Sequence, residues 1–130
     1  MINNLPSSIT HLTFGFDFNQ PLDNLPSSIR YLTFSNGSNF NQPLDNLPTT
    51  LTHLIFKYNS KLESKYNMIL NHSNFDQSLN NLPPNLEFIQ LPINYKNQIL
   101  NIPLKLQTIK CSVEYTYIYD FADFEIITLE

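Results

Sequence analysis

A pattern that returns about every 20 residues constrains this chain more than any other feature of its sequence. Five blocks begin with an apolar residue followed by proline, at positions 5, 25, 47, 82 and 102, so the steps between them are 20, 22, 35 and 20 residues. Apolar residues then recur at fixed places, which in the first block are Ile9, Leu12 and Phe14. Five columns in register indicate stacked units that share one design.

The spacing inside a unit predicts how each unit folds. Leu12 and Phe14 are two apart, and two such residues face the same side only on a strand. A unit of this length leaves no room for the long crossover helix of a βαβ unit, and prolines such as Pro6 and Pro21 disfavour long helices. We therefore expect a mainly β fold with little helix: a parallel β-solenoid of about five coils. Short strands would form its concave face and irregular segments its convex return.

The repeats also set the expected boundaries. The repeat region covers residues 1–111, with coils near 5–24, 25–46, 47–81, 82–101 and 102–111. The long third step reflects an inserted loop at 57–74. Within it, residues 61–70 are compatible with a short helix, with a loop that packs back on its coil, or with a contact site for a partner.

The ends of the chain depart from the repeat. Residues 113–120 and 121–130 have the alternation and the β-branched and aromatic content of strands, and five acidic residues lie among them. Residues 112–130 therefore predict a β-rich C-terminal cap. No comparable cap precedes Ile2, so the first coil is expected to expose an apolar edge that invites self-association.

One polar column is as regular as the apolar ones. Asparagine stands just before the first apolar residue of every block, at Asn4, Asn24, Asn46, Asn81 and Asn101. We interpret it as a structural ladder of side-chain amides that satisfies backbone groups at the turns. A row of exposed, ligand-binding amides is the alternative.

Two further columns should face outward from the strands. Their members are His11, Tyr31, His53 and Phe88 in one, and Thr13, Thr33, Ile55 and Gln90 in the other. An aromatic strip with few charges is typical of a protein-binding surface, so these eight are the candidate partner-binding residues. The alternative is that the rings only stack on one another along the sheet.

The sequence contains no motif typical of catalysis or of cofactor binding. His11 and His53 are two coils apart, roughly 10 Å at the usual strand spacing, with no further ligand type in their strip, so no metal is expected. Cys111 falls in a core column and has no evident base. We expect no catalytic residues, no cofactor and no enzyme activity.

Charge and segment composition restrict partners and location. The net charge is −4 and the seven Lys and Arg residues are scattered, which argues against nucleic acid. No apolar run is long enough to span a membrane, and the start of the chain does not resemble a signal peptide. A single cysteine fits a reducing compartment. We expect a cytoplasmic or nuclear protein (in the host cytoplasm if viral) that is not secreted.

The block from Leu5 to Pro21, with its Leu-Pro start and its Phe-Asn-Gln-Pro end, resembles the FNIP repeat. That repeat belongs to the wider leucine-rich class and is abundant in social amoebae and in large viruses that infect amoebae. The resemblance is close in the first two coils, good over 47–56, looser over 75–91 and faint after Tyr95. It implies a curved, leucine-rich-repeat-like solenoid.

Family members often carry an F-box ahead of the repeats, which couples them to a ubiquitin ligase. Because the first repeat begins at Met1, we expect no F-box here. The expected function is a non-catalytic protein-interaction module that binds a partner on its concave strand face. A finer form of this function is a substrate-recognition repeat of a ubiquitin-ligase receptor. The alternative is a structural or vestigial fragment that self-associates through its uncapped N-terminal coil.

Overall fold

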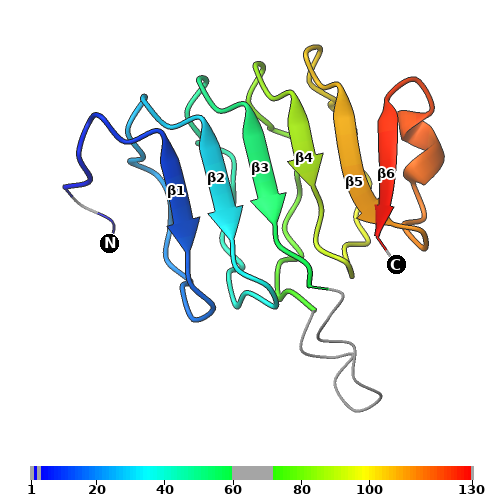
Figure 1. Ribbon diagram of the computed structural model, residues 1–130, viewed down its shortest axis with the longest axis horizontal. Helices are drawn as coiled ribbons and strands as arrows, with labels where there is room; N and C mark the ends of the chain where they lie inside the picture. Colours follow the sequence, from blue (N-terminus) through cyan, green and yellow to red (C-terminus); the bar gives the residue numbers. More distant parts are fainter. Residues whose placement is uncertain (1, 3, 60–71, 130) are drawn as a thin grey trace.

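The computed structural model describes residues 2, 4–59 and 72–129 and shows one sheet of six parallel strands whose spatial order is the sequence order (Figure 1). The strands are β1 (His11–Phe14), β2 (Tyr31–Phe34), β3 (His53–Phe56), β4 (Phe88–Gln90), β5 (Thr108–Ser112) and β6 (Glu125–Leu129). Their register sets Leu12 opposite Leu32 and Leu32 opposite Leu54, so the apolar columns lie side by side. The predicted solenoid is confirmed.

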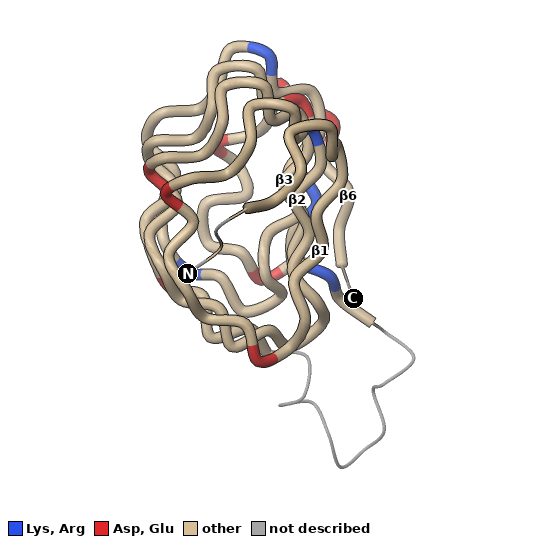
Figure 2. Tube along the Cα trace, turned by 90° about the vertical axis from the view of Figure 1, so that its left-hand side faces the viewer, with Lys and Arg blue, Asp and Glu red and all other residues tan. Residues whose placement is uncertain are grey.

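Seen from its N-terminal end, successive coils follow nearly the same outline, with the strands along one side and the return segments along the other (Figure 2). The core lies between these two walls. Leu32, Leu54 and Ile89 are fully buried on the inner side of the strands. Rings from the return segments meet rings from the strands, as in the Phe34–Phe40 pair, whose centroids are 4.3 Å apart. A single coil could not bury these side chains without its neighbours.

A turn at each block's proline brings the chain into the strand. In all five blocks the proline carbonyl accepts a hydrogen bond from the N–H three residues later; in the first this bond joins Ile9 to Pro6, with N and O 3.3 Å apart. Proline suits the first position because it needs no N–H there and holds the preceding residue extended. The turn therefore fixes the point at which the inward column begins.

The C-terminal segment differs from the prediction. Residues 113–124 form turns and a 3₁₀ helix, Ile118–Phe121, and not the expected strand over 113–120. Only β6 is extended, and it adds a sixth parallel strand to the sheet. Tyr115 and Phe121 are buried while Tyr119 between them is 86% exposed. The spacing of the buried rings is that of a turning return segment, in which alternating tyrosines mimic a strand pattern.

The helix considered for residues 61–70 lies outside the described residues. Within the described part of the chain, none of the helices has the length and apolar character needed to cross a membrane.

Candidate interaction surfaces

Four aromatic side chains form a continuous stack on the outer face of the sheet. The ring centroids of His11 and Tyr31 are 4.2 Å apart, those of Tyr31 and His53 4.4 Å, and those of His53 and Phe88 5.5 Å. Alternation along the strands puts these residues on the face opposite the core. His11 is exposed and the other three are half-buried. Because ring faces cover one another, the stack presents ring edges and its open end at His11.

The environment of His53 favours one tautomer of its ring. The Thr52 hydroxyl donates to the carbonyl of Arg30, with a separation of 3.1 Å, so its oxygen is left to accept from Nδ1 of His53, 2.9 Å away. This arrangement favours the tautomer with the proton on Nδ1, in which Nε2 of the neutral ring is an acceptor. Burial lowers the pKa of His53, nearby Glu87 raises it and His11 lowers it further. The net direction is downward, which favours the neutral ring.

The second outward column is less accessible than the first. Thr13 is exposed and Ile55 is half-buried, whereas Thr33 and Gln90 are 9% and 8% exposed. Lys110 continues the column on β5 and is half-buried. The structure thus brings all eight candidate residues onto one face, but leaves Thr33 and Gln90 little surface for a partner.

Gln90 has a structural task that its position in the repeat did not reveal. At the ends of β1 and β2, the strand's last carbonyl accepts a backbone N–H from the next coil. After β4 the corresponding residue is Pro92, which has no N–H to donate. The Gln90 side-chain amide donates to the Phe56 carbonyl at 2.9 Å and takes the place of that backbone donor. A buried carbonyl would otherwise lack a partner.

The asparagine column makes contacts between coils, mainly to neighbouring carboxylates. Asn46 donates to Asp23 at 3.2 Å, and Asn81 donates to Asp45 at 2.9 Å. Asn101 donates to the backbone carbonyl of Asn80 at 3.0 Å. Each of these three amides therefore ties its coil to the preceding one.

A second polar ladder was not foreseen. The Asn19 side-chain oxygen accepts from the backbone N–H of Asn41 and from the amide of Gln42, at 2.9 and 3.0 Å. Asn41 repeats this with the N–H of Asp76 and the amide of Gln77. The signal was present in the sequence: asparagine follows the recurring phenylalanine of the second half-coil. These asparagines replace strand pairing in the return wall, where the chain is irregular.

The described residues hold no group of three or more His, Cys, Asp or Glu side chains placed to bind a metal ion. Cys111 is fully buried in its core column, and burial raises the pKa of its thiol. A protonated, inaccessible thiol is a poor nucleophile.

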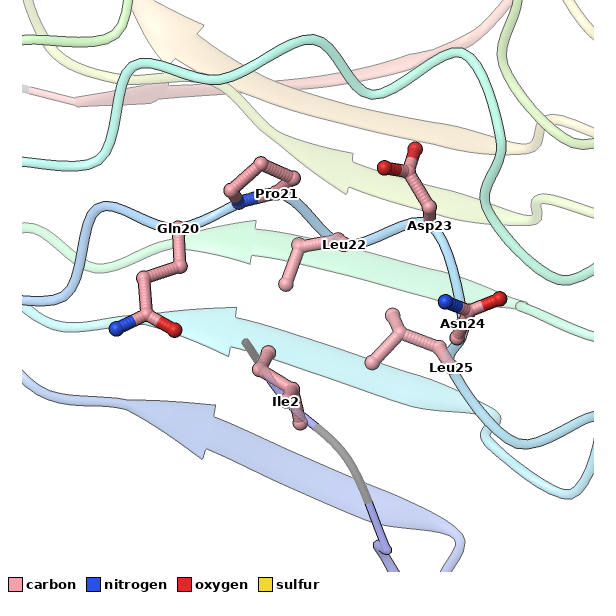
Figure 3. Close-up of a pocket in the computed structure, with 7 residues that line it drawn as sticks. All are labelled: Ile2, Gln20, Pro21, Leu22, Asp23, Asn24 and Leu25. Atoms are coloured by element: carbon pink, nitrogen blue, oxygen red, sulfur yellow. The ribbon is translucent and has the colours of Figure 1, made fainter.

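The first coil carries an open apolar hollow of about 370 Å³ at the N-terminal end of the stack. The side chains of Ile2, Leu22 and Leu25 project into a common space there, beside β1 (Figure 3). Gln20, Pro21, Asp23 and Asn24 complete the lining. In the inner coils, the corresponding side of the core is covered by a neighbouring coil. This hollow is the apolar edge expected of the first coil.

The fold and these surfaces define a leucine-rich-repeat-like solenoid with an outward aromatic stack. The FNIP repeat model matches residues 1–37 and 18–59, so this part of the chain carries FNIP repeats. A search of curated proteins found no match. Among solved structures, the chain is similar to CroV588, described as a novel circular LRR protein, with 31% identity over 85% of this chain and a TM-score of 0.64. The chain spans only 15% of that protein's length.

Proposed function

We propose that this chain is a non-catalytic protein-interaction module whose partner binds the outer sheet face along His11, Tyr31, His53 and Phe88. Solenoids of this class are typically interaction scaffolds. The observation that carries the proposal is the aromatic stack itself, which keeps four rings on the surface side of a fold that has an ample core elsewhere.

The chemistry of the stack indicates what kind of partner fits. Ring edges and half-buried side chains offer rigid apolar contact at little cost in conformational entropy. The Nε2 atom of neutral His53 adds one hydrogen-bond acceptor. Only Lys110 is charged in the neighbouring column. A partner should therefore present an apolar or aromatic segment with few charges, and its binding should persist at high salt.

The test is partner capture with two tyrosine variants. Tyr31→Ala removes one of the two central rings of the stack and should abolish capture from cell extract. The loss of its two ring contacts is worth about 1 kcal/mol each, so the variant should remain folded with a modestly lower Tm. Tyr119→Ala is the matched control, because this tyrosine is 86% exposed on the C-terminal segment, away from the stack.

Equal capture by Tyr31→Ala and the wild type would overturn the proposal. Unfolding of the variant would show that the ring belongs to the scaffold, and Phe88→Ala then serves as a second probe at the other end of the stack.

The same proposal includes a finer role, substrate recognition for a ubiquitin ligase, which is supported by the FNIP repeats alone. Co-purification of ligase subunits together with the captured partner is the result expected of that role. Capture of a partner without any ligase subunit would leave only the binding module.

A further inference from the structure

The outer edge of β1 is a row of backbone groups that no described strand pairs. The carbonyls of Thr10 and Phe14 accept hydrogen bonds from the neighbouring coil at 3.0 and 3.1 Å. Backbone groups alternate sides along a strand, so the N–H and carbonyl groups of His11 and Thr13 point the other way. β1 is the first strand of the sheet, and an edge of this kind is a template for another strand.

The opposite edge of the sheet is complementary to the first. The N–H of Glu125 donates to Gln107 on the β5 side at 2.9 Å. The N–H and carbonyl groups of Ile126 and Thr128 therefore point away from β5. β6 is the last strand in the described sheet.

Placing β6 of a second copy beside β1, in the register used throughout the sheet, satisfies both edges. The N–H groups of His11 and Thr13 would donate to the carbonyls of Phe124 and Ile126 of the second copy. The N–H groups of Ile126 and Thr128 would donate in return.

This register also pairs side chains. The outward column runs from His11 at one end of the sheet to Glu125 at the other. Across the new contact, an exposed imidazole would lie opposite an exposed carboxylate.

The apolar surfaces at the two ends match as well. The first coil has the hollow lined by Ile2, Leu22 and Leu25. The C-terminal return segment exposes Val113 and Tyr119, at 52% and 86%. With β6 placed beside β1, the last return segment of one copy would face the first coil of the next, with the chain that leads into β1 between them.

We propose that copies of this chain associate head to tail, with β6 of one copy extending the sheet at β1 of the next. This contact is heterologous: it uses two different surfaces and leaves one of each free at the ends of every assembly. The alternative is a symmetric contact of β1 with β1. In that contact no carboxylate would lie opposite His11, and β6 would stay unpaired. Head-to-tail contact uses both edges and is independent of the partner proposed for the aromatic stack.

Light scattering with size separation, over a series of concentrations at moderate ionic strength, tests the proposal. The wild-type chain should pass from a 15.1 kDa monomer to a dimer and then to larger species as its concentration rises. A monomer at every concentration overturns the proposal. A dimer that never grows indicates the symmetric β1–β1 contact and also overturns it.

Two proline variants identify the surfaces. Thr13→Pro and Thr128→Pro each remove an N–H that faces an open edge and no N–H used between the chain's own strands, which is where proline is tolerated. Each variant alone should be monomeric, because one of its two surfaces is blocked. Mixed in equal amounts, they should form a dimer and nothing larger, since each supplies the surface that the other lacks. Failure of the mixture to dimerise, with both variants folded, contradicts the proposal.

Charge variants give a test that leaves the backbone unchanged. Glu125→Lys puts a cation opposite His11 and should raise the dissociation constant several-fold. Glu114→Lys makes the same charge change at another exposed position of the C-terminal segment, outside β6, and should have a smaller effect. Equal effects would mean that net charge, and not the His11–Glu125 register, governs association.

Discussion

At the scale of single residues, side-chain amides stand in for backbone groups throughout this solenoid. A coil of about 20 residues with one short strand leaves many backbone groups unpaired. Asn41 accepts from two donors of the next coil, and Gln90 supplies the donor that Pro92, which has no N–H, cannot give to the Phe56 carbonyl. Such bonds matter most where the group they satisfy is buried, because an unmet buried carbonyl keeps its full desolvation cost.

Replacing Gln90 with leucine should therefore destabilise the fold although it adds apolar surface. The Phe56 carbonyl would lose its donor, and we expect the free energy of unfolding to fall by about 1–3 kcal/mol. Urea denaturation measures this. Gln107→Leu is the control, since the Gln107 side chain is exposed and next to the same sheet face. Equal midpoints for the two variants would show that the Gln90 bond contributes nothing.

At the scale of elements, the return wall is built on an aromatic column that changes from phenylalanine to tyrosine toward the C-terminus. Phe75, Tyr95 and Tyr115 follow one another with centroids 6.0 and 6.2 Å apart. The Tyr95 hydroxyl donates to the Gln77 carbonyl and the Tyr115 hydroxyl to the Asn97 carbonyl, at 2.9 and 2.7 Å. The added hydroxyl thus ties each coil to the preceding one.

This column should make stability sensitive to alkaline pH. Burial raises the pKa of Tyr95 to about 12 and also raises that of Tyr115. An unfolded tyrosine ionises near its usual value of about 10. Above about pH 10 the unfolded state loses protons that the folded state keeps, so the free energy of unfolding falls as pH rises toward 12. Below pH 10 these two groups contribute no dependence.

Tyr95→Phe should weaken that alkaline dependence and cost about 1 kcal/mol at neutral pH through the lost hydrogen bond. Denaturation midpoints at several pH values are the measurement, with exposed Tyr119→Phe as the control. An unchanged pH slope in Tyr95→Phe would assign the dependence to other groups.

The strands could be predicted from the sequence because each rests on a period-two pair that recurs in register. Leu12 with Phe14 would be ambiguous alone, but the same pair in successive units is not. The C-terminal segment could not be predicted this way, since Tyr115, Tyr117 and Tyr119 alternate like a strand while following a turn. The outward stack was predictable from alternation. The role of Gln90 was not predicted: Pro92 is visible in the sequence, but the bond from the Gln90 amide to the Phe56 carbonyl depends on the side-chain conformation.

At the scale of the whole molecule, the solenoid is a one-dimensional stack in which each coil contacts only its neighbours. The free energy of unfolding should then be the sum of a contribution from each coil and a contribution from each contact between adjacent coils. An inner coil has two such contacts, whereas the first coil has one among the described residues. The open hollow and the unpaired β1 edge are consequences of that single contact.

The same substitution should consequently cost less in the first coil than in an inner one. Leu54 is fully buried between Leu32 and Ile89, so Leu54→Ala should lower the free energy of unfolding by about 2–5 kcal/mol. Leu12 occupies the same column but is only partly buried, with a strand on one side. The cost of Leu12→Ala should fall below that range, because its removed atoms leave a site already open to water.

Urea denaturation at a concentration where the chain is monomeric measures the cost of both substitutions. If association covers the first coil, the cost of Leu12→Ala should grow with protein concentration while that of Leu54→Ala grows less. Equal costs in the monomer would contradict the nearest-neighbour description.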